Sequence, residues 1–286
     1  MRFEIIGGDE RSRQLALLLA GEGHEVGCFA LDKAELPEYV RRLQRPEGAD
    51  CVILPLPAET GRLGTLNAPF SAISYSAGRL LSALGEGSIV CAGKISPRLR
   101  AAASESGVRL FDYMARPEFT VGNAAVTAEG AVSLCMSSTG GTVSGSRALV
   151  IGWGRVGKLS ALKLSALGAE VTVLSRSSES RAMAEAMGLR AVSPQRAAEL
   201  LPRFDMLVNT APARVLPDEA LALIRHGCFV LELASAPGGI DAEAAEKYGL
   251  NYLAAPGLPG KYAPLASAQL IRGAVMNIIE ECAGND

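Results

Sequence analysis

Residues 147–177 read RALVIGWGRVGKLSALKLSALGAEVTVLSRS, and this stretch decides the fold of the chain. It predicts a strand, a glycine turn, a helix and a second strand, in that order, at 148–151, 152–157, 158–167 and 170–174. Gly152 allows a tight turn, Gly154 lets the backbone approach a pyrophosphate, and Gly157 lets the helix pack closely against the strand. The helix N-terminus then faces the anion. The alternative is a glycine-rich turn in an ordinary parallel-sheet unit, without a ligand.

The end of the second strand bears on which dinucleotide is bound. NAD sites usually carry Asp or Glu about 20 residues after the glycines, where it accepts a hydrogen bond from the ribose 2′-hydroxyl. This chain has Ser175, Arg176 and Ser177 there. A guanidinium and two hydroxyls suit a 2′-phosphate, and no carboxylate is present to repel it. We therefore predict NADP rather than NAD, the alternative being that Arg176 is a solvated turn residue.

Further turns follow the later predicted strands, at NTAPA (209–213), ELASAPGG (232–239) and APGLPGKYAP (255–264). Ligands of open α/β sheets bind outside the carboxyl ends of the strands, so these turns are expected to border the nicotinamide. Each could also be an ordinary turn. The predicted cofactor-binding residues are Gly152, Trp153, Gly154, Arg155, Val156, Gly157, Ser175, Arg176, Ser177, Thr210, Ala211, Pro212, Ala234, Ser235 and Pro256.

Composition limits the class of protein. The chain has 286 residues, of which 49% are hydrophobic and 20% charged, with a formal net charge of -2. These values are typical of an ordinary globular protein of about two domains, and no basic excess indicates nucleic acid. We expect a cytoplasmic protein, because no signal-peptide pattern opens the chain and no apolar run is long enough to span a membrane.

The cysteines and histidines do not indicate a metal site. Six cysteines are scattered singly through mostly apolar segments, and the only two histidines are His24 and His226. Without a CxxC or other short ligand spacing, we expect reduced core cysteines and no metal.

The first half of the chain repeats the strand, turn, helix and strand more loosely. Segments 2–6 and 25–30 are predicted strands, and 11–19 is a predicted helix. Gly7 and Gly8 do not complete the fingerprint, and Asp9 would repel a pyrophosphate at this turn. We therefore assign this half to the scaffold or to the substrate.

The regular alternation of strands and helices predicts an α/β protein with two Rossmann-like doubly wound domains and parallel sheets. An interdomain helix joins the domains, and a C-terminal helix closes the chain. The predicted divisions are a substrate-side domain at 1–120 together with the helix at 265–286, an interdomain helix and hinge at 121–140, and an NADP-binding Rossmann domain at 141–264.

Several segments together resemble one enzyme family. NAAVTAEGAV (123–132), GWGRVG, LSRS, NTAPA, LELASAPGG and APGLPGKYAP are similar to segments of the A subunits of dipicolinate synthases from spore-forming bacteria. The resemblance covers nearly the whole chain. Its most specific parts are TAEG and PGLPG, since many dehydrogenases share the glycine fingerprint.

The resemblance implies an NAD(P)-dependent oxidoreductase that makes pyridine-2,6-dicarboxylate from dihydrodipicolinate, itself derived from hydroxy-tetrahydrodipicolinate of lysine biosynthesis. It also implies a role in the mother-cell cytoplasm during sporulation, together with a small flavoprotein-like B subunit. A homo-oligomer is expected, although composition does not separate an apolar interface from an apolar core.

A dicarboxylate substrate needs cationic or hydroxyl partners, and loss of its proton needs an acceptor. The candidate catalytic residues are Lys94 of AGK, Arg116 in YMARPEF, Lys261 in PGLPGK and, as proton acceptor, Glu129 of TAEG. The basic residues could instead be surface charges, and Glu129 could brace the hinge helix.

Two other functions stay open. One is a non-catalytic NADP-binding subunit that senses redox state, which the scarcity of recognisable catalytic side chains favours. The other is a 2-hydroxyacid-dehydrogenase-like enzyme acting on another substrate. Those enzymes use an Arg after a late strand and a catalytic His, whereas ELASAPGG has no Arg and APGLPG has no His.

Overall fold

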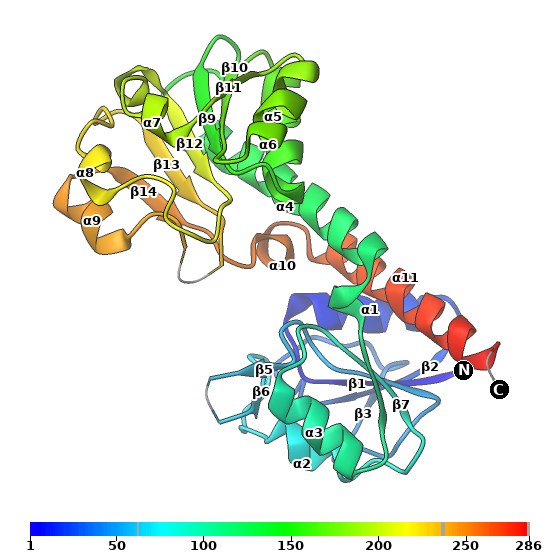
Figure 1. Cartoon of the computed structure of the whole chain (residues 1–286). Helices are drawn as coiled ribbons and strands as arrows, with labels where there is room; N and C mark the ends of the chain where they lie inside the picture. Colours follow the sequence, from blue (N-terminus) through cyan, green and yellow to red (C-terminus); the bar gives the residue numbers. More distant parts are fainter. Residues whose placement is uncertain (62, 236–237, 285–286) are drawn as a thin grey trace. The chain divides into compact units, whose positions relative to one another are not determined.

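The computed structural model describes residues 1–61, 63–235 and 238–284. The chain forms two compact units (Figure 1). The first consists of Met1–Asn123 and Ala263–Asp286, and the second of Ala124–Tyr262. The boundary between Asn123 and Ala124 falls inside helix α4 (Pro117–Ser138), which overlaps the predicted connecting segment 121–140.

The first unit contains a six-stranded parallel sheet in the order β3-β2-β1-β4-β7-β8. Its strands are β1 (Arg2–Ile6), β2 (Glu25–Phe29), β3 (Arg41–Arg42), β4 (Cys51–Ile53), β7 (Ile89–Ala92) and β8 (Arg109–Asp112). A separate antiparallel pair is formed by β5 (Glu59–Thr60) and β6 (Thr65–Leu66). Its helices are α1 (Glu10–Gly21), α2 (Ala77–Leu81), α3 (Pro97–Glu105), the 3-10 turn η1 (Tyr113–Ala115), the start of α4, and α11 (Pro264–Ala283).

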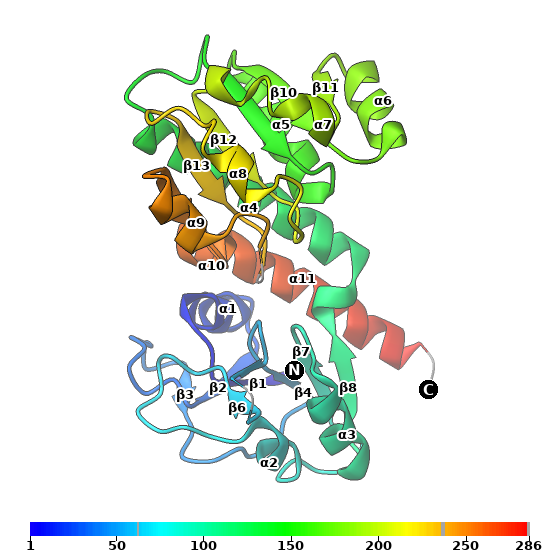
Figure 2. The ribbon, with the colours of Figure 1, turned by 60° about the vertical axis from the view of Figure 1, so that its left-hand side comes forward.

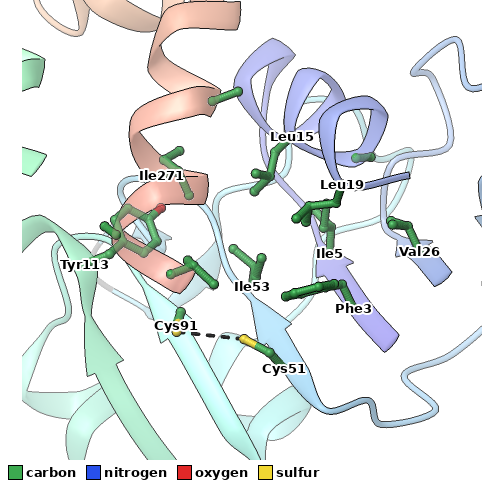
Figure 3. Close-up of a cluster of buried hydrophobic side chains, with 14 of the residues drawn as sticks. Phe3, Ile5, Leu15, Leu19, Val26, Cys51, Ile53, Cys91, Tyr113 and Ile271 are labelled. Carbon is green, nitrogen blue, oxygen red and sulfur yellow. Dashed lines mark hydrogen bonds between the residues drawn. The ribbon is translucent and has the colours of Figure 1, made fainter. Parts of the chain in front are cut away.

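Helices cover both faces of this sheet. Figure 2 shows α1 and α11 on one face and α2 and α3 on the other. On the α1 and α11 face, Phe3 and Ile5 of β1 pack with Leu15 and Ile271 (Figure 3). Ile6 points to the other face, into a core shared with α2 and α3. Since both faces are buried, the central strands are mostly apolar, as parallel strands generally are, although β1 also contains the buried Glu4.

The second unit contains another six-stranded parallel sheet, in the order β11-β10-β9-β12-β13-β14. Its strands are β9 (Arg147–Ile151), β10 (Glu170–Leu174), β11 (Arg190–Val192), β12 (Met206–Asn209), β13 (Phe229–Glu232) and β14 (Asn251–Ala254). Its helices are the rest of α4, then α5 (Arg155–Ala166), α6 (Ser178–Ala186), α7 (Pro194–Ala197), the 3-10 turn η2 (Leu201–Arg203), α8 (Asp218–Leu221), α9 (Ala242–Lys247) and α10 (Leu258–Tyr262).

Two cores lie on the two faces of this sheet. One joins α4, α5 and α6 to β9 and β10, through residues such as Cys135, Leu164 and Val173. The other joins α7, α8 and α9 to the alternate residues of the same strands, such as Leu149. Side chains alternate between the faces of a strand, so each strand serves both cores.

These sheets confirm the predicted fold class, an α/β protein with two doubly wound parallel sheets and a long C-terminal helix. The strand order 3-2-1-4-5-6 of each sheet is the Rossmann order. Two predicted helix starts were wrong. The helix α5 begins at Arg155, three residues before the predicted start, because the fingerprint spacing assigns residues 155–157 to the turn, and α4 begins at Pro117, four residues before the predicted connecting segment. The short helices α2, α3, α6, α7 and α10, the edge strands β3 and β11 and the pair β5 and β6 were not predicted.

Within 1–61, 63–235 and 238–284, no helix is both long and apolar enough to cross a membrane. The same residues contain no group of three or more His, Cys, Asp or Glu suited to holding a metal ion.

Candidate functional site

The glycine turn after β9 is built so that only glycine fits at two of its positions. Gly152 has a φ of +100°, which side chains rarely tolerate, and a Cβ there would lie 2.6 Å from the hydroxyl oxygen of Thr210. A Cβ on Gly157 would lie 2.3 Å from the carbonyl oxygen of Gly152. The backbone of α5 therefore packs directly on the end of β9, as the third fingerprint glycine allows.

Gly154 differs from the other two glycines because nothing in the protein fills the space beside it. A Cβ on Gly154 would meet no atom within 4 Å. Gly154 caps α5 without a side-chain hydrogen bond, and its carbonyl accepts from Lys158 N at 2.9 Å. The first amides of a helix have no acceptor within the helix. An open space bordered by such amides fits a pyrophosphate.

The residues between these glycines differ in exposure. Trp153 is buried, and its indole Nε1 has no acceptor within the described chain. The ammonium of Lys158 lies 5.9 Å from the centre of the Trp153 ring. Arg155 is exposed and Val156 is half-buried. The indole therefore fixes the inner side of the turn, while a guanidinium and an ammonium add positive charge outside it.

The end of β10 carries two arginines. The Arg176 side chain is exposed. Arg181, on α6, donates from Nη1 to the carbonyl oxygens of Ser175 and Arg176, both at 2.8 Å. Ser177 caps α6 by accepting from Ser180 N at 3.2 Å, which leaves its hydroxyl proton free to donate. Arg181 was not among the predicted site residues, although its position close to Arg176 in the sequence was a signal for it.

Beyond the glycine turn, Thr210 ties β12 to β9. Its hydroxyl donates to the carbonyl of Ile151 at 2.8 Å, and its amide donates to the same oxygen at 2.9 Å. Ala211 is half-buried and Pro212 is exposed. These contacts hold the NTAPA turn against the turn that contains Gly152.

A buried pair joins the ends of β12 and β13. The side-chain amide of Asn209 donates to both carboxylate oxygens of Glu232, each at 2.8 Å. Asn209 is 1% and Glu232 4% exposed. The Glu232 carboxylate also accepts from the amide of Ala234 at 2.8 Å. Neither side chain was among the predicted site residues. The sequence did contain a signal for Glu232, because it ends an apolar strand.

The remaining predicted cofactor contacts lie on later turns. Ala234 is half-buried, and Ser235 and Pro256 are exposed. Ala236 and Pro237 of the ELASAPGG turn lie outside the described residues.

The four predicted catalytic residues are divided between the two units. Lys94 and Arg116 belong to the first, and Glu129 and Lys261 to the second. Lys261 is exposed on α10.

Arg116 and Glu129 are each held in ion pairs. Arg116 donates to the carboxylate of Glu281 at 2.6 and 2.9 Å and also binds Glu118. Glu129 accepts from Lys163 Nζ at 3.0 Å. Lys163 lies eight residues after the start of α5, which is about 12 Å along the helix. Glu129 is therefore paired with a residue about two turns along α5 from the glycine turn, and this arrangement does not favour it as a base acting at the dinucleotide.

Lys94 follows β7 in a strained conformation. Its φ is +57°, in the region that residues other than glycine rarely adopt. Asp112 stabilises this turn by accepting from the amides of Lys94 and Ile95, both at 3.2 Å. Such strain in a tightly held loop is common at functional sites.

The exposed Lys94 side chain borders a hollow of about 480 Å³ at the carboxyl ends of β4 and β7. Arg98 and Ser96 also line it, together with Glu59, whose carboxylate accepts from the Ser96 hydroxyl. Lys94 and Arg98 give this hollow two cations that can bind a carboxylate-bearing molecule, and the Glu59 carboxylate offsets part of their charge.

Two family models match the chain. Residues 2–114 match the N-terminal domain of the dipicolinate synthase A subunit, and residues 121–235 match the NAD binding domain of D-isomer specific 2-hydroxyacid dehydrogenases. The second unit therefore carries an NAD(P)-binding domain, which agrees with the open space at Gly154.

Full-length relatives point to one family. The dipicolinate synthase A subunit of Bacillus subtilis (strain 168) is 28% identical over 292 residues, which cover 98% of this chain and 96% of the relative. The crystal structure of the same subunit from Bacillus halodurans has a TM-score of 0.86 and 29% identity over 97% of both chains. The crystal structure of the Bacillus subtilis protein has a TM-score of 0.85 and 28% identity, covering 100% of this chain and 98% of the other. The chain belongs to the family of dipicolinate synthase A subunits.

Proposed function

We propose that this chain is the dinucleotide-binding A subunit of a dipicolinate synthase and oxidises dihydrodipicolinate to pyridine-2,6-dicarboxylate with NADP. The observation that supports this most is the likeness to a dipicolinate synthase A subunit over 98% of the chain. The open space at Gly154, beside the first amides of α5, supports the dinucleotide part of the proposal.

The reaction removes one hydride and one proton from the dihydropyridine ring. Bound NADP supplies the hydride acceptor, and the proton leaves to a base or to water. If the hydroxylated precursor is the substrate, one water is lost before this step. The ring becomes aromatic, which provides driving force, so the protein mainly has to orient the ring and bind its carboxylates.

NADP is favoured over NAD by the charge at the end of β10. Arg176 is exposed there, and Arg181 holds the carbonyls of the same turn. A guanidinium forms strong bidentate hydrogen bonds with phosphate. The strand ends on Leu174 rather than on a carboxylate, so nothing at this position favours a free ribose hydroxyl.

Lys94 is the residue that we assign to a substrate carboxylate within the first unit, and Lys261 is kept as a candidate cation of the second unit. Lys94 borders the hollow that Arg98 also lines, and Lys261 is exposed on α10. Arg116 and Glu129 are held by carboxylate and ammonium partners within their own units, so we give them no contact with the substrate.

The cellular setting and the partner protein belong to the same proposal. A flavoprotein-like B subunit is the proposed partner, in a homo-oligomeric assembly. The proposed location is the mother-cell cytoplasm of a sporulating bacterium. These statements rest on the family alone.

The test is a turnover assay with purified chain, alone and with a B subunit. Dihydrodipicolinate precursor and NADP are added, and the absorbances of NADPH and of the aromatic product are followed together. Equal amounts of both products support the proposal, and NAD serves as the cofactor control. Aromatic product formed at the same rate when this chain is left out would overturn it.

A second candidate is a non-catalytic NADP-binding subunit. It is favoured by the ion pairs that hold two of the four candidate catalytic residues. Tight NADP binding without turnover under every partner condition would support this candidate over the enzyme.

A further inference from the structure

Glu232 is a carboxylate buried at the edge of the second unit's sheet. Besides the side chain of Asn209 and the amide of Ala234, the amides of Gly239 and Ile240 donate to it, at 3.1 and 2.9 Å. Each of its oxygens therefore accepts at least two hydrogen bonds. A protonated acid would direct its own hydrogen at one of these donors, so the arrangement fits the ionised form.

No basic side chain forms an ion pair with this carboxylate in the part of the chain that the structure describes. None of the ion pairs within it involves Glu232. Arg214, on the loop after β12, is bound to Asp218 and Asp241 instead. Backbone dipoles and one neutral amide stabilise the Glu232 carboxylate, but they leave its full negative charge in place.

The position of this charge follows from the strand order. Asn209 and Glu232 are paired residues at the ends of β12 and β13, and β12 lies next to β9. The order of the sheet reverses between β9 and β12, which is where a dinucleotide crosses it. The glycine turn and β10 take the pyrophosphate and the adenosine, so the nicotinamide half extends over β12 and β13.

The pair also shapes the two turns on that side. The amide of Asn209 reaches the carbonyl of Ala211 at 3.1 Å, and its oxygen accepts from the amide of Ala211 at 3.3 Å. Gly239 packs so closely that a Cβ on it would lie 2.5 Å from the nitrogen of the Asn209 side chain. Asn209 thus holds the turn after β12, and Glu232 binds the amides of Ala234, Gly239 and Ile240 after β13.

We propose that the Asn209–Glu232 pair makes this site select the oxidised dinucleotide. The nicotinamide ring is cationic in NADP⁺ and neutral in NADPH, so a buried anion attracts only the oxidised ring. This inference rests on the proposed function, because it requires a bound dinucleotide. It gives Glu232 a role beyond bracing the turns: the reduced product is bound more weakly than the oxidised cofactor, which favours its release.

The experiment measures dissociation constants by titration calorimetry, without turnover. The ligands are NADP⁺, NADPH and 2′-phospho-ADP-ribose, which lacks the nicotinamide. In the wild-type chain NADP⁺ should bind more tightly than NADPH. In Glu232→Gln the dissociation constant of NADP⁺ divided by that of NADPH should rise by at least about fivefold. The reason is that glutamine keeps the shape of the side chain but removes its negative charge.

Two variants separate charge from shape. Glu232→Asp keeps the charge but shortens the side chain, so it should weaken both dinucleotides and leave their ratio unchanged. Glu4→Gln is the matched control, because Glu4 is also a buried strand carboxylate that accepts two backbone amides, from Glu47 and Gly48, and lies in the first unit. It should change none of the three constants.

An equal loss of NADP⁺ and NADPH affinity in Glu232→Gln would overturn the proposal and leave Glu232 a bracing residue. If that variant does not fold, the wild-type measurement decides, since NADPH binding as tight as NADP⁺ binding contradicts a selecting anion. Failure of every dinucleotide to bind the wild-type chain would instead refute the proposed function, so the two failures are distinguishable.

Discussion

Gly157 packs on Gly152 so closely that a Cβ on Gly157 would lie 2.3 Å from the Gly152 carbonyl oxygen, whereas a Cβ on Gly154 would meet nothing within 4 Å. The same motif therefore contains one glycine required by the protein's own packing and one whose open side is left for a ligand. Substitutions at the two positions should fail in different ways.

Gly157→Ala should lower the free energy of unfolding by about 2 kcal/mol, because backbone must move to admit the methyl group. Gly154→Val should keep the thermal midpoint close to that of the wild type but abolish measurable NADP binding, because its side chain occupies the space for the pyrophosphate. Thermal unfolding and calorimetric titration of both variants check this. Retained NADP affinity in Gly154→Val would contradict the position of the dinucleotide.

Arg176→Ala should weaken NADP binding by about 10- to 100-fold, the value of a charge-assisted hydrogen bond to phosphate. NAD binding should change little, because NAD has no 2′-phosphate. The control is Arg190→Ala, which removes a largely exposed arginine from β11 of the same sheet. Equal losses for NADP and NAD would mean that Arg176 contacts only the adenine.

Lys94→Gly should raise KM for the dicarboxylate substrate at least about tenfold while the NADP dissociation constant stays constant. Glycine accepts the φ of +57° without strain, so the loop should keep its shape and lose only the ammonium. Lys94→Arg keeps the charge and should recover part of the affinity. An unchanged KM in Lys94→Gly would remove this residue from the substrate site.

Glu129→Gln should leave turnover within about twofold of the wild type, because it breaks only a partly exposed pair with Lys163. The matched variant Lys163→Gln breaks the same pair from the other side and should behave alike. If only Glu129→Gln abolishes turnover while NADP affinity is kept, Glu129 is the proton acceptor after all, as the TAEG segment predicts.

Arg116 makes the stability of the first unit depend on pH. Its hydrogen bonds hold the pKa of both Glu118 and Glu281 below the usual range. A lowered folded-state pKa gives stabilisation that is complete above the unfolded value of about 4.3 and is lost as pH falls through the lower folded-state value.

Arg116→Ala should therefore lower the thermal midpoint at pH 7, and the difference from wild type should shrink between about pH 4 and pH 2 as the carboxylates become protonated. All three side chains are partly or largely exposed, so the effect should be small and weaker in high salt. A difference that grows on acidification would contradict the sign of these pKa changes.

The glycine turn and the sheet around it were predictable because their signals are local. The spacing of Gly152, Gly154 and Gly157 after an apolar run encodes one backbone geometry, and the apolar segments predicted the neighbouring strands β9 and β10. The start of α5 was missed because Gly154 caps the helix with no side chain, so the usual Ser, Thr, Asp or Asn signal is absent. By contrast, α3 begins with Ser96 followed by Pro97, a helix-start signal that was present but not used.

The Asn209–Glu232 pair could not be predicted from local pattern. The two residues lie 23 positions apart and meet only because β12 and β13 are neighbours in register. Likewise, Arg116 reaches Glu281 across 165 positions, because α11 returns to the first unit. Contacts of this kind depend on the completed topology, so neither composition nor local residue spacing predicts them.

The C-terminal helix also determines the order in which the protein can mature on the ribosome. Ala268, Ile271 and Ile278 of α11 belong to the same core as Phe3 and Leu15, near the opposite end of the chain. Because α1 covers only part of that face, synthesis must reach α11 before the apolar side of the N-terminal sheet is fully covered. Until then the nascent chain presents that side to chaperones and proteases, and even a short C-terminal deletion should damage the part of the protein that is made first.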